Sequence, residues 1–283
     1  MPNATVKHVT DGPDRRREGL RADCGRCVAL CCVAPAFTAS ADFAINKPAG
    51  QPCPNLRADF RCSIHERLRP SGFSGCAAYD CFGAGQKVVH QTFAGRDWRS
   101  ESELAAPMFA AFSVMRALHE LMWYLNEALA MPLAKPFRDE VNDLLLSTER
   151  STLGNHEELI ALDVNAHRGD VNAVLLRVSA HVRNSAGYAG ADHRSADLAG
   201  KDLRGAHLAG ASLRGALLIG ADLSGVDLSY ADLTGADFRG ANLARADLEA
   251  SLFTSQPQVD SARGDAETVL PSRLTRPRHW AAG

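Results

Sequence analysis

The sequence predicts a multidomain α+β protein built from a cysteine-rich domain, an α-helical middle and a C-terminal stack of square coils. Three observations carry this prediction. All eight cysteines lie between Cys24 and Cys81, apolar residues recur at spacings of three and four between residues 100 and 185, and a five-residue repeat occupies residues 196–253. The predicted parts are a flexible N-terminal tail at 1–20, the cysteine-rich domain at 21–99, a helical region at 100–190, the repeats at 191–255 and a C-terminal cap at 256–283.

The composition of the 283 residues is that of an ordinary globular protein, with 46% hydrophobic and 23% charged residues. The net charge of −2 excludes a simple basic nucleic-acid binder, so we do not expect direct nucleic-acid binding. Charged residues at Arg116, Glu120 and Glu127 interrupt the longest apolar stretch, and the first residues contain no apolar signal segment. We therefore expect a cytoplasmic location without a membrane span.

The cysteines of the first hundred residues are spaced as metal ligands are. Cys24 and Cys27 form a Cys-x2-Cys pair, which lets two sulfurs face one ion at ~2.3 Å. Thiols stay reduced in the cytoplasm, where we expect the protein to lie. Together with the spacing, this favours metal ligands over disulfides. The predicted metal ligands are Cys24, Cys27, Cys31, Cys32, Cys53, Cys62, Cys76 and Cys81. Eight thiolates suffice for two four-sulfur sites or for one iron–sulfur cluster with the remainder structural, and zinc and an iron–sulfur cluster both stay open.

Residues 21–82 resemble a family of zinc- or iron-chelating domains. The resemblance rests on the opening cysteine cluster at 24–32 and on the later run Cys62-Ser-Ile-His65-Glu, with Arg69-Pro70 and Cys76 following. His65 stands where the family has an aromatic residue, which leaves it as a metal ligand or as a hydrogen-bonding support for one. Some relatives in that family are lysine methylases, so the resemblance also admits an enzyme.

The helical middle is predicted from its apolar periodicity. Leu104, Met108, Met115 and Leu129 belong to a long run at helical spacing that Pro132 ends. Further helices are predicted around residues 137–145 and 171–182, and Asn155 is a candidate N-cap for a short helix between them. The methionines and aromatic residues of the first run are expected to be core residues rather than cofactor ligands.

The five-residue repeat holds its phase for twelve units. Every unit has Leu or Phe at its centre, and nine of the twelve have Ala two residues before it. A period of five fits neither a helix nor a strand, but it fits one side of a square coil in which four units close a turn. The twelve centres are Leu198, Leu203, Leu208, Leu213, Leu218, Leu223, Leu228, Leu233, Phe238, Leu243, Leu248 and Phe253.

These units resemble the pentapeptide-repeat family, most directly in ADLSG at 221–225, ADLTG at 231–235 and ANLAR at 241–245. The resemblance implies a right-handed quadrilateral β-helix of about three coils. An open coil exposes unpaired backbone, so Val259, Leu270, Leu274 and Trp280 of the tail are expected to cover the last coil.

The sequence leaves three functions open. The first is a metal-binding, non-catalytic accessory module that docks an unidentified partner protein on the stiff coil. The second is an iron–sulfur-dependent redox or methyl-transfer enzyme, an oxidoreductase or methyltransferase whose catalytic residues the sequence does not identify. The third is a DNA-mimicking modulator of topoisomerases, which the net charge of −3 over residues 191–255 supports only weakly. The edges of a short stack could also pair two chains as a homodimer.

Overall fold

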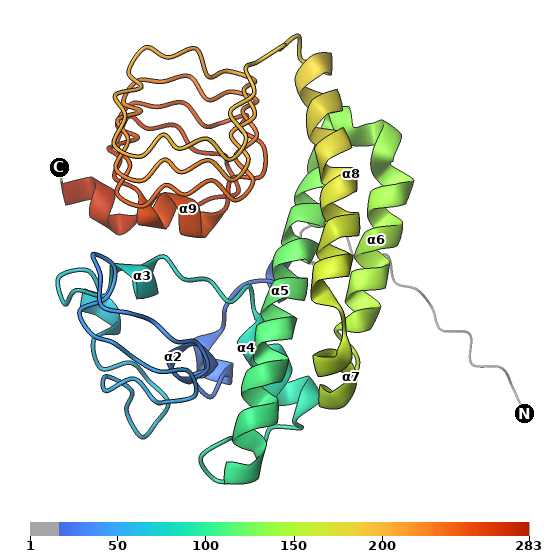
Figure 1. The fold of residues 1–283 in the computed structure, drawn as a ribbon, viewed down its shortest axis with the longest axis vertical. Coiled ribbons are helices and arrows are strands. Elements are labelled where there is room, and N and C mark those ends of the chain that lie inside the picture. Colours follow the sequence, from blue (N-terminus) through green and yellow to red (C-terminus); the bar gives the residue numbers. More distant parts are fainter. Residues whose placement is uncertain (1–16, 283) are drawn as a thin grey trace, which may run out of the picture.

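The computed structural model describes residues 17–282, and the regular secondary structure of these residues is helical. Figure 1 shows three bodies side by side: a loop-rich N-terminal region, a bundle of long helices and a stack of coils that lies beside the top of the bundle. No helix in this part of the chain combines the length and the apolar character that a membrane span requires.

The N-terminal region consists of loops with short helical turns. These turns are η1 (Cys24–Arg26), α2 (Leu30–Val33), η2 (His65–Arg67), α3 (Ser74–Ala77), α4 (Ala84–Lys87), the π-helical turn η3 (Val88–Thr92) and η4 (Ser102–Leu104). Of the predicted tail at 1–20, only residues 17–20 are described, and there Arg17 bonds Glu127 while Leu20 is buried in the core. The rest of that tail lies outside the described residues.

The long helix α5 (Ala105–Ala130) organises the bundle. Its lower half packs on the N-terminal region, where Met108, Phe112 and Met115 are buried against α2 and α4 residues. Its upper half packs on the other long helices and on Leu252 and Phe253 of the coils. The remaining elements of the bundle are η5 (Pro132–Phe137), α6 (Arg138–Ser151), α7 (His156–Ala161) and α8 (Val164–Ser185). Asn155 is confirmed as the N-cap of α7, where Glu158 completes a capping box.

The repeats form a stack of four-sided coils, which we call the coil stack and define as residues 189–254. Parallel bridges join residues twenty apart, such as Ser212 with Asp232 and Asp222 with Asn242. Inside the stack the centres from Leu213 to Leu248 are fully or almost fully buried. The backbone is bonded from coil to coil, as where the amide of Leu223 donates to the carbonyl of Asn242 at 2.8 Å.

The predicted fold class is wrong for the coil stack, because the described residues contain no β-strand, no sheet and hence no β-helix. Each five-residue side contributes one bridging residue and then turns. The turn places a residue at positive φ, which is Gly at most corners, as at Gly225 (φ 71°), and Tyr230 at one of them. A ladder of successive paired residues cannot grow between such turns, so the sides remain isolated bridges.

The C-terminal tail lies under the last coil, where Figure 1 shows α9 (Gln256–Ser261) and the C-terminus. Val259 and Trp280 belong to the same buried cluster as the leucines of the stack, and Leu270 and Leu274 pack against it. The indole Nε1 of Trp280 donates to the carbonyl of Ala262 at 3.0 Å, so its single polar atom is satisfied in the core. The chain ends in the short turn η6 (Arg278–Ala282).

Candidate functional site

The exposed side of the coil stack that carries Asp227, Asp247 and Glu249 is here called the acidic face. Asp227 and Asp247 are bridge partners in successive coils, and Glu249 is exposed two residues after Asp247. Each aspartate accepts a hydrogen bond from a backbone amide of its own coil, Asp227 from Ser229 at 2.8 Å and Asp247 from Glu249 at 2.9 Å. These bonds fix the carboxylates in place before any partner arrives.

The carboxylates of the acidic face have no cation beside them, a property that they share with Asp197 among the aspartates of the coil stack. Asp192, Asp202 and Asp237 each pair with an arginine two residues further along the chain. Within residues 17–282, no Lys or Arg lies within ion-pair distance of Asp227, Asp247 or Glu249. The acidic face therefore presents three negative charges that the described part of the chain leaves available.

The cysteines predicted as ligands fall into two neighbourhoods. Electrostatic interactions connect Cys24, Cys27, Cys31 and Cys81 with one another. A second set of interactions connects Cys32, Cys53, Cys62 and Cys76. Cys31 and Cys32, adjacent in α2, join the two neighbourhoods, with their Sγ atoms 3.9 Å apart. All eight are free thiols.

The metal-binding prediction, with zinc or an iron–sulfur cluster, is not confirmed and stays a prediction. Nowhere in residues 17–282 are three or more His, Cys, Asp or Glu side chains grouped so that they could hold an ion. The predicted support residue His65 lies in η2 and is not brought into any such group. Bringing the thiols into the same region was thus not enough to arrange them around a common centre.

Burial favours the neutral thiol at most of these cysteines. It raises the pKa of Cys27 to about 11 and that of Cys76 to about 12. Cys32 behaves differently, because its pKa is lowered, first by its hydrogen bond with Cys31 and further by the nearby Lys47.

A buried lysine supplies the positive charge in the second neighbourhood. Lys47 is 3% exposed, and its Nζ donates to the carbonyls of Val33, Pro48 and Gln51 at 2.9 to 3.0 Å. Burial lowers the pKa of Lys47, and the nearby thiols of Cys53, Cys32 and Cys76 act in the opposite direction. An ammonium among these thiols repels a second cation there. No sequence motif marks Lys47, because its role depends on contacts with separate loops.

His119 is a buried neutral histidine on α5, beside the cysteine-rich region. Its Nδ1 bonds the carbonyl oxygen of Phe82 at 2.6 Å, and its Nε2 is buried without a partner. Burial, together with the nearby Lys87 ammonium, lowers the pKa of His119 from 6.5 to about 4, against the opposing effect of the hydrogen bond to Phe82. This histidine is a core residue.

We expect His119 to make the fold sensitive to acid. Between pH 6.5 and 4 the unfolded chain binds a proton at this residue and the folded chain does not, so stability falls as the pH falls through that window. The free energy of unfolding at pH 4 should be lower than that at pH 7 by ~3 kcal/mol because of this residue. Urea unfolding of the wild type and of His119→Asn, which keeps a donor but does not titrate, should show their difference in stability shrinking over this window. A difference that stays constant with pH would contradict the assignment.

Comparison with known proteins places the repeats in a family. A family model described as pentapeptide repeats matches residues 189–225 and 216–254, with eight copies of the repeat. The predicted resemblance of the coil stack is thereby confirmed. The match begins at residue 189, so it does not extend to the cysteine-rich region, and the resemblance of that region to chelating domains is not confirmed.

One curated relative is similar along almost the whole chain. The uncharacterized protein YybG of Bacillus subtilis (strain 168) is 53% identical over 264 residues, which are 92% of this chain and 95% of the relative. The chain belongs to the YybG family. Similarity over this length means that the family shares the N-terminal region and helical bundle as well as the repeats.

Proposed function

We propose that the chain is a non-catalytic docking module that binds a basic segment of a partner protein on the acidic face of the coil stack. Pentapeptide repeats support a protein-interaction role in general. The observation that carries the specific proposal is the set of three carboxylates at Asp227, Asp247 and Glu249, which have no arginine or lysine partner in the described chain.

The physical case rests on pre-organisation. Binding is weakened when side chains and loops must be ordered, and a surface that is already fixed loses less entropy. In the acidic face the backbone is bonded between coils and two of the carboxylates are bonded to backbone amides. Rows of fixed negative charge select lysine- or arginine-rich segments and speed their encounter with the face.

The test measures how much partner protein co-purifies with tagged wild-type and variant chains from the native host. The variant Asp227→Asn/Asp247→Asn/Glu249→Gln removes three charges but keeps the oxygen that accepts each backbone hydrogen bond. We expect the amount of partner bound to this variant to fall about tenfold or more. A tenfold change in affinity corresponds to only ~1.4 kcal/mol of binding free energy. The same variant should also weaken the dependence of binding on salt.

A matched control removes aspartates at equivalent positions on other sides of the stack. Asp202→Asn/Asp237→Asn changes carboxylates that already pair with Arg204 and Arg239. This control should retain the partner. Equal retention by the three-residue variant, or equal loss by the control, would refute docking on the acidic face.

A further inference from the structure

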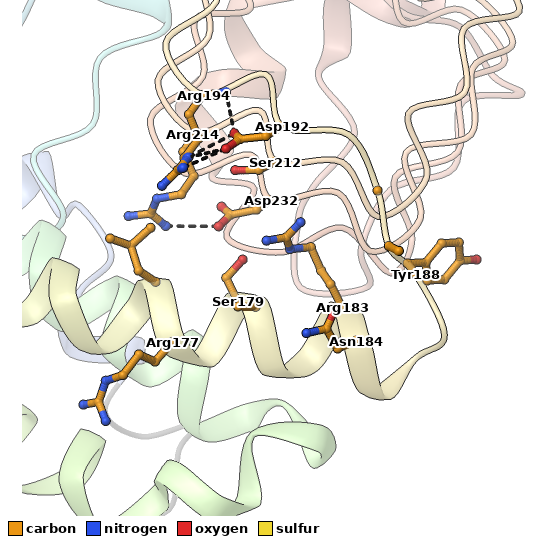
Figure 2. A pocket seen from close by; sticks show the side chains of 14 residues that line it. Arg177, Ser179, Arg183, Asn184, Tyr188, Asp192, Arg194, Ser212, Arg214 and Asp232 are labelled. Carbon is orange, nitrogen blue, oxygen red and sulfur yellow. Dashed lines mark hydrogen bonds and ion pairs between the residues drawn. The ribbon is translucent and has the colours of Figure 1, made fainter.

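A cavity of ≈ 470 Å³ lies between α8 and the first coils of the coil stack. Figure 2 shows Ser179 and Arg183 reaching up from the helix and Ser212, Arg214 and Asp232 facing them from the coils. The cavity is thus walled by two parts of the chain, and any ligand in it would contact both.

One arginine of the lining has no carboxylate partner. Arg194 pairs with Asp192, Arg214 pairs with Asp232 at 3.1 Å, and Arg177 pairs with Glu140 outside the cavity. Arg183 instead donates from Nη1 to the carbonyl of Gly210 at 3.0 Å, and its Nε is buried without a partner. Within the described residues no carboxylate lies within ion-pair distance of Arg183, although its charge helps to lower the pKa of the Asp192 carboxylate. Because Asp192 already pairs with Arg194, the arginines of the lining outnumber by one the carboxylates that pair with them.

A buried hydroxyl stands one helical turn before this arginine. Ser179 is 1% exposed and lines the cavity, and its Oγ has no hydrogen-bond partner. An unsatisfied buried polar group costs about 1–3 kcal/mol, and a ligand that accepts from it recovers that cost. Residues four apart lie on the same face of a helix, so Ser179 and Arg183 point their donors into the same space.

The buried carboxylate of the opposite wall already has hydrogen-bond partners within the protein. Asp232 is fully buried, and its oxygens accept from Arg214, from the amide of Thr234 at 3.0 Å and from the hydroxyl of Thr234 at 2.6 Å. The negative charge of Asp232 is thereby balanced by groups of the protein itself. The side-chain atoms of α8 that lack a partner, Ser179 Oγ and Arg183 Nε, can donate hydrogen bonds, which suits an anion.

We propose that this cavity binds the phosphate group of a small phosphorylated molecule. A tetrahedral phosphate has oxygens on all sides and can accept from both walls, whereas a carboxylate has two oxygens in one plane. Guanidinium groups form strong charge-assisted bonds to phosphate, and hydroxyls of serine complete its coordination. The volume exceeds that of a bare phosphate, which leaves room for the organic part of the ligand.

The test titrates the full chain with inorganic phosphate and with glycerol 3-phosphate, followed by calorimetry and thermal unfolding. Sodium chloride at equal ionic strength and malonate serve as comparison solutes. We expect saturable binding of both phosphates, tighter for glycerol 3-phosphate, with a raised unfolding temperature. Ser179→Ala and Arg183→Gln should each weaken binding by about tenfold, which corresponds to one lost charged or buried hydrogen bond.

Two controls separate binding from folding. Ser179→Ala removes an unsatisfied hydroxyl, so the free variant should be as stable as the wild type or more so. Ser185→Ala, an exposed hydroxyl on the same helix outside the cavity, should bind phosphate as the wild type does. Absence of saturable binding beyond the chloride control, malonate binding as tight as phosphate, or unchanged affinity in Ser179→Ala would each overturn the proposal.

Discussion

Replacing Leu223 by Asp should unfold the coil stack. The side chain of Leu223 is fully buried between coils, and its amide is bonded to the next coil. Deleting a buried leucine side chain costs about 2–5 kcal/mol, and placing an unpartnered carboxylate there adds the cost of burying a charge. A total stability of about 5–15 kcal/mol does not absorb that loss. Urea unfolding followed by circular dichroism should show the transition of the repeats lost or shifted to very low denaturant.

The coil stack supplies its own control for this change. Leu217 lies in the same stack but is 42% exposed, at the bridge position between Asp197 and Asp237 where the neighbouring coils carry aspartate. Leu217→Asp introduces the same charge at an exposed position where aspartate fits the coil. The free energy of unfolding of this variant should therefore stay within about 0.5 kcal/mol of the wild-type value. Cooperative unfolding of Leu223→Asp at wild-type denaturant concentrations would contradict the assignment of Leu223 to the interior.

Neutralising Glu127 should destabilise the whole chain. Glu127 is 3% exposed on α5, where Arg17 bonds it at 2.8 Å and Arg273 of the C-terminal tail bonds its other oxygen. Burial raises the pKa of Glu127, and the two guanidiniums act against that rise. In Glu127→Gln two partly buried cations lose their common carboxylate, and removing one partner from a buried ion pair costs about 3–5 kcal/mol. Chemical denaturation measures the loss directly.

An exposed ion pair of the same composition serves as the comparison for Glu127. Glu140 pairs with Arg177 at the surface of the bundle, where both side chains are about half exposed. Glu140→Gln should cost less than about 1 kcal/mol, because water replaces the lost partner. Equal losses in the two variants would show that the buried group of Arg17, Glu127 and Arg273 does not join the three segments.

The repeats were the most predictable part of the chain. Their constant phase placed Leu213, Leu223 and Leu233 inside a coil, and these residues are buried as expected. The secondary structure of the sides was not predictable in the same way, because a period states which residues face inward but not how many consecutive residues pair. One bridging residue for each five is too few for a strand.

The cysteine-rich region shows a different limit of sequence reasoning. The spacing of Cys24 and Cys27 is compatible with a metal site, but spacing alone does not place the other thiols around the same point. Lys47 lies beside the second neighbourhood because its Nζ donates to three backbone carbonyls, and no motif in the sequence signals this arrangement. The cysteine spacing therefore predicted that the thiols lie in the same region, and the metal that they would bind stays a prediction.

The cavity could not be predicted because its two walls come from different parts of the chain. Ser179 and Arg183 look like ordinary polar residues on the outer face of a helix, and Ser212 occupies a position that is polar in most repeats. Only the packing of α8 on the first coils buries the hydroxyl of Ser179 and turns Arg183 toward it. A signal existed in the spacing of four between these two residues, but such a pair is common on solvent-facing helices.

Hydrogen exchange of the chain, alone and with its co-purified partner, measures docking on the coil stack most directly. If the acidic face binds the partner, peptides that contain Asp227 and residues 245–250 should gain protection, while those of α6 and α7 should not change. Protection confined to the helical bundle or to the cysteine-rich region, with the acidic face unchanged, would contradict the proposed function.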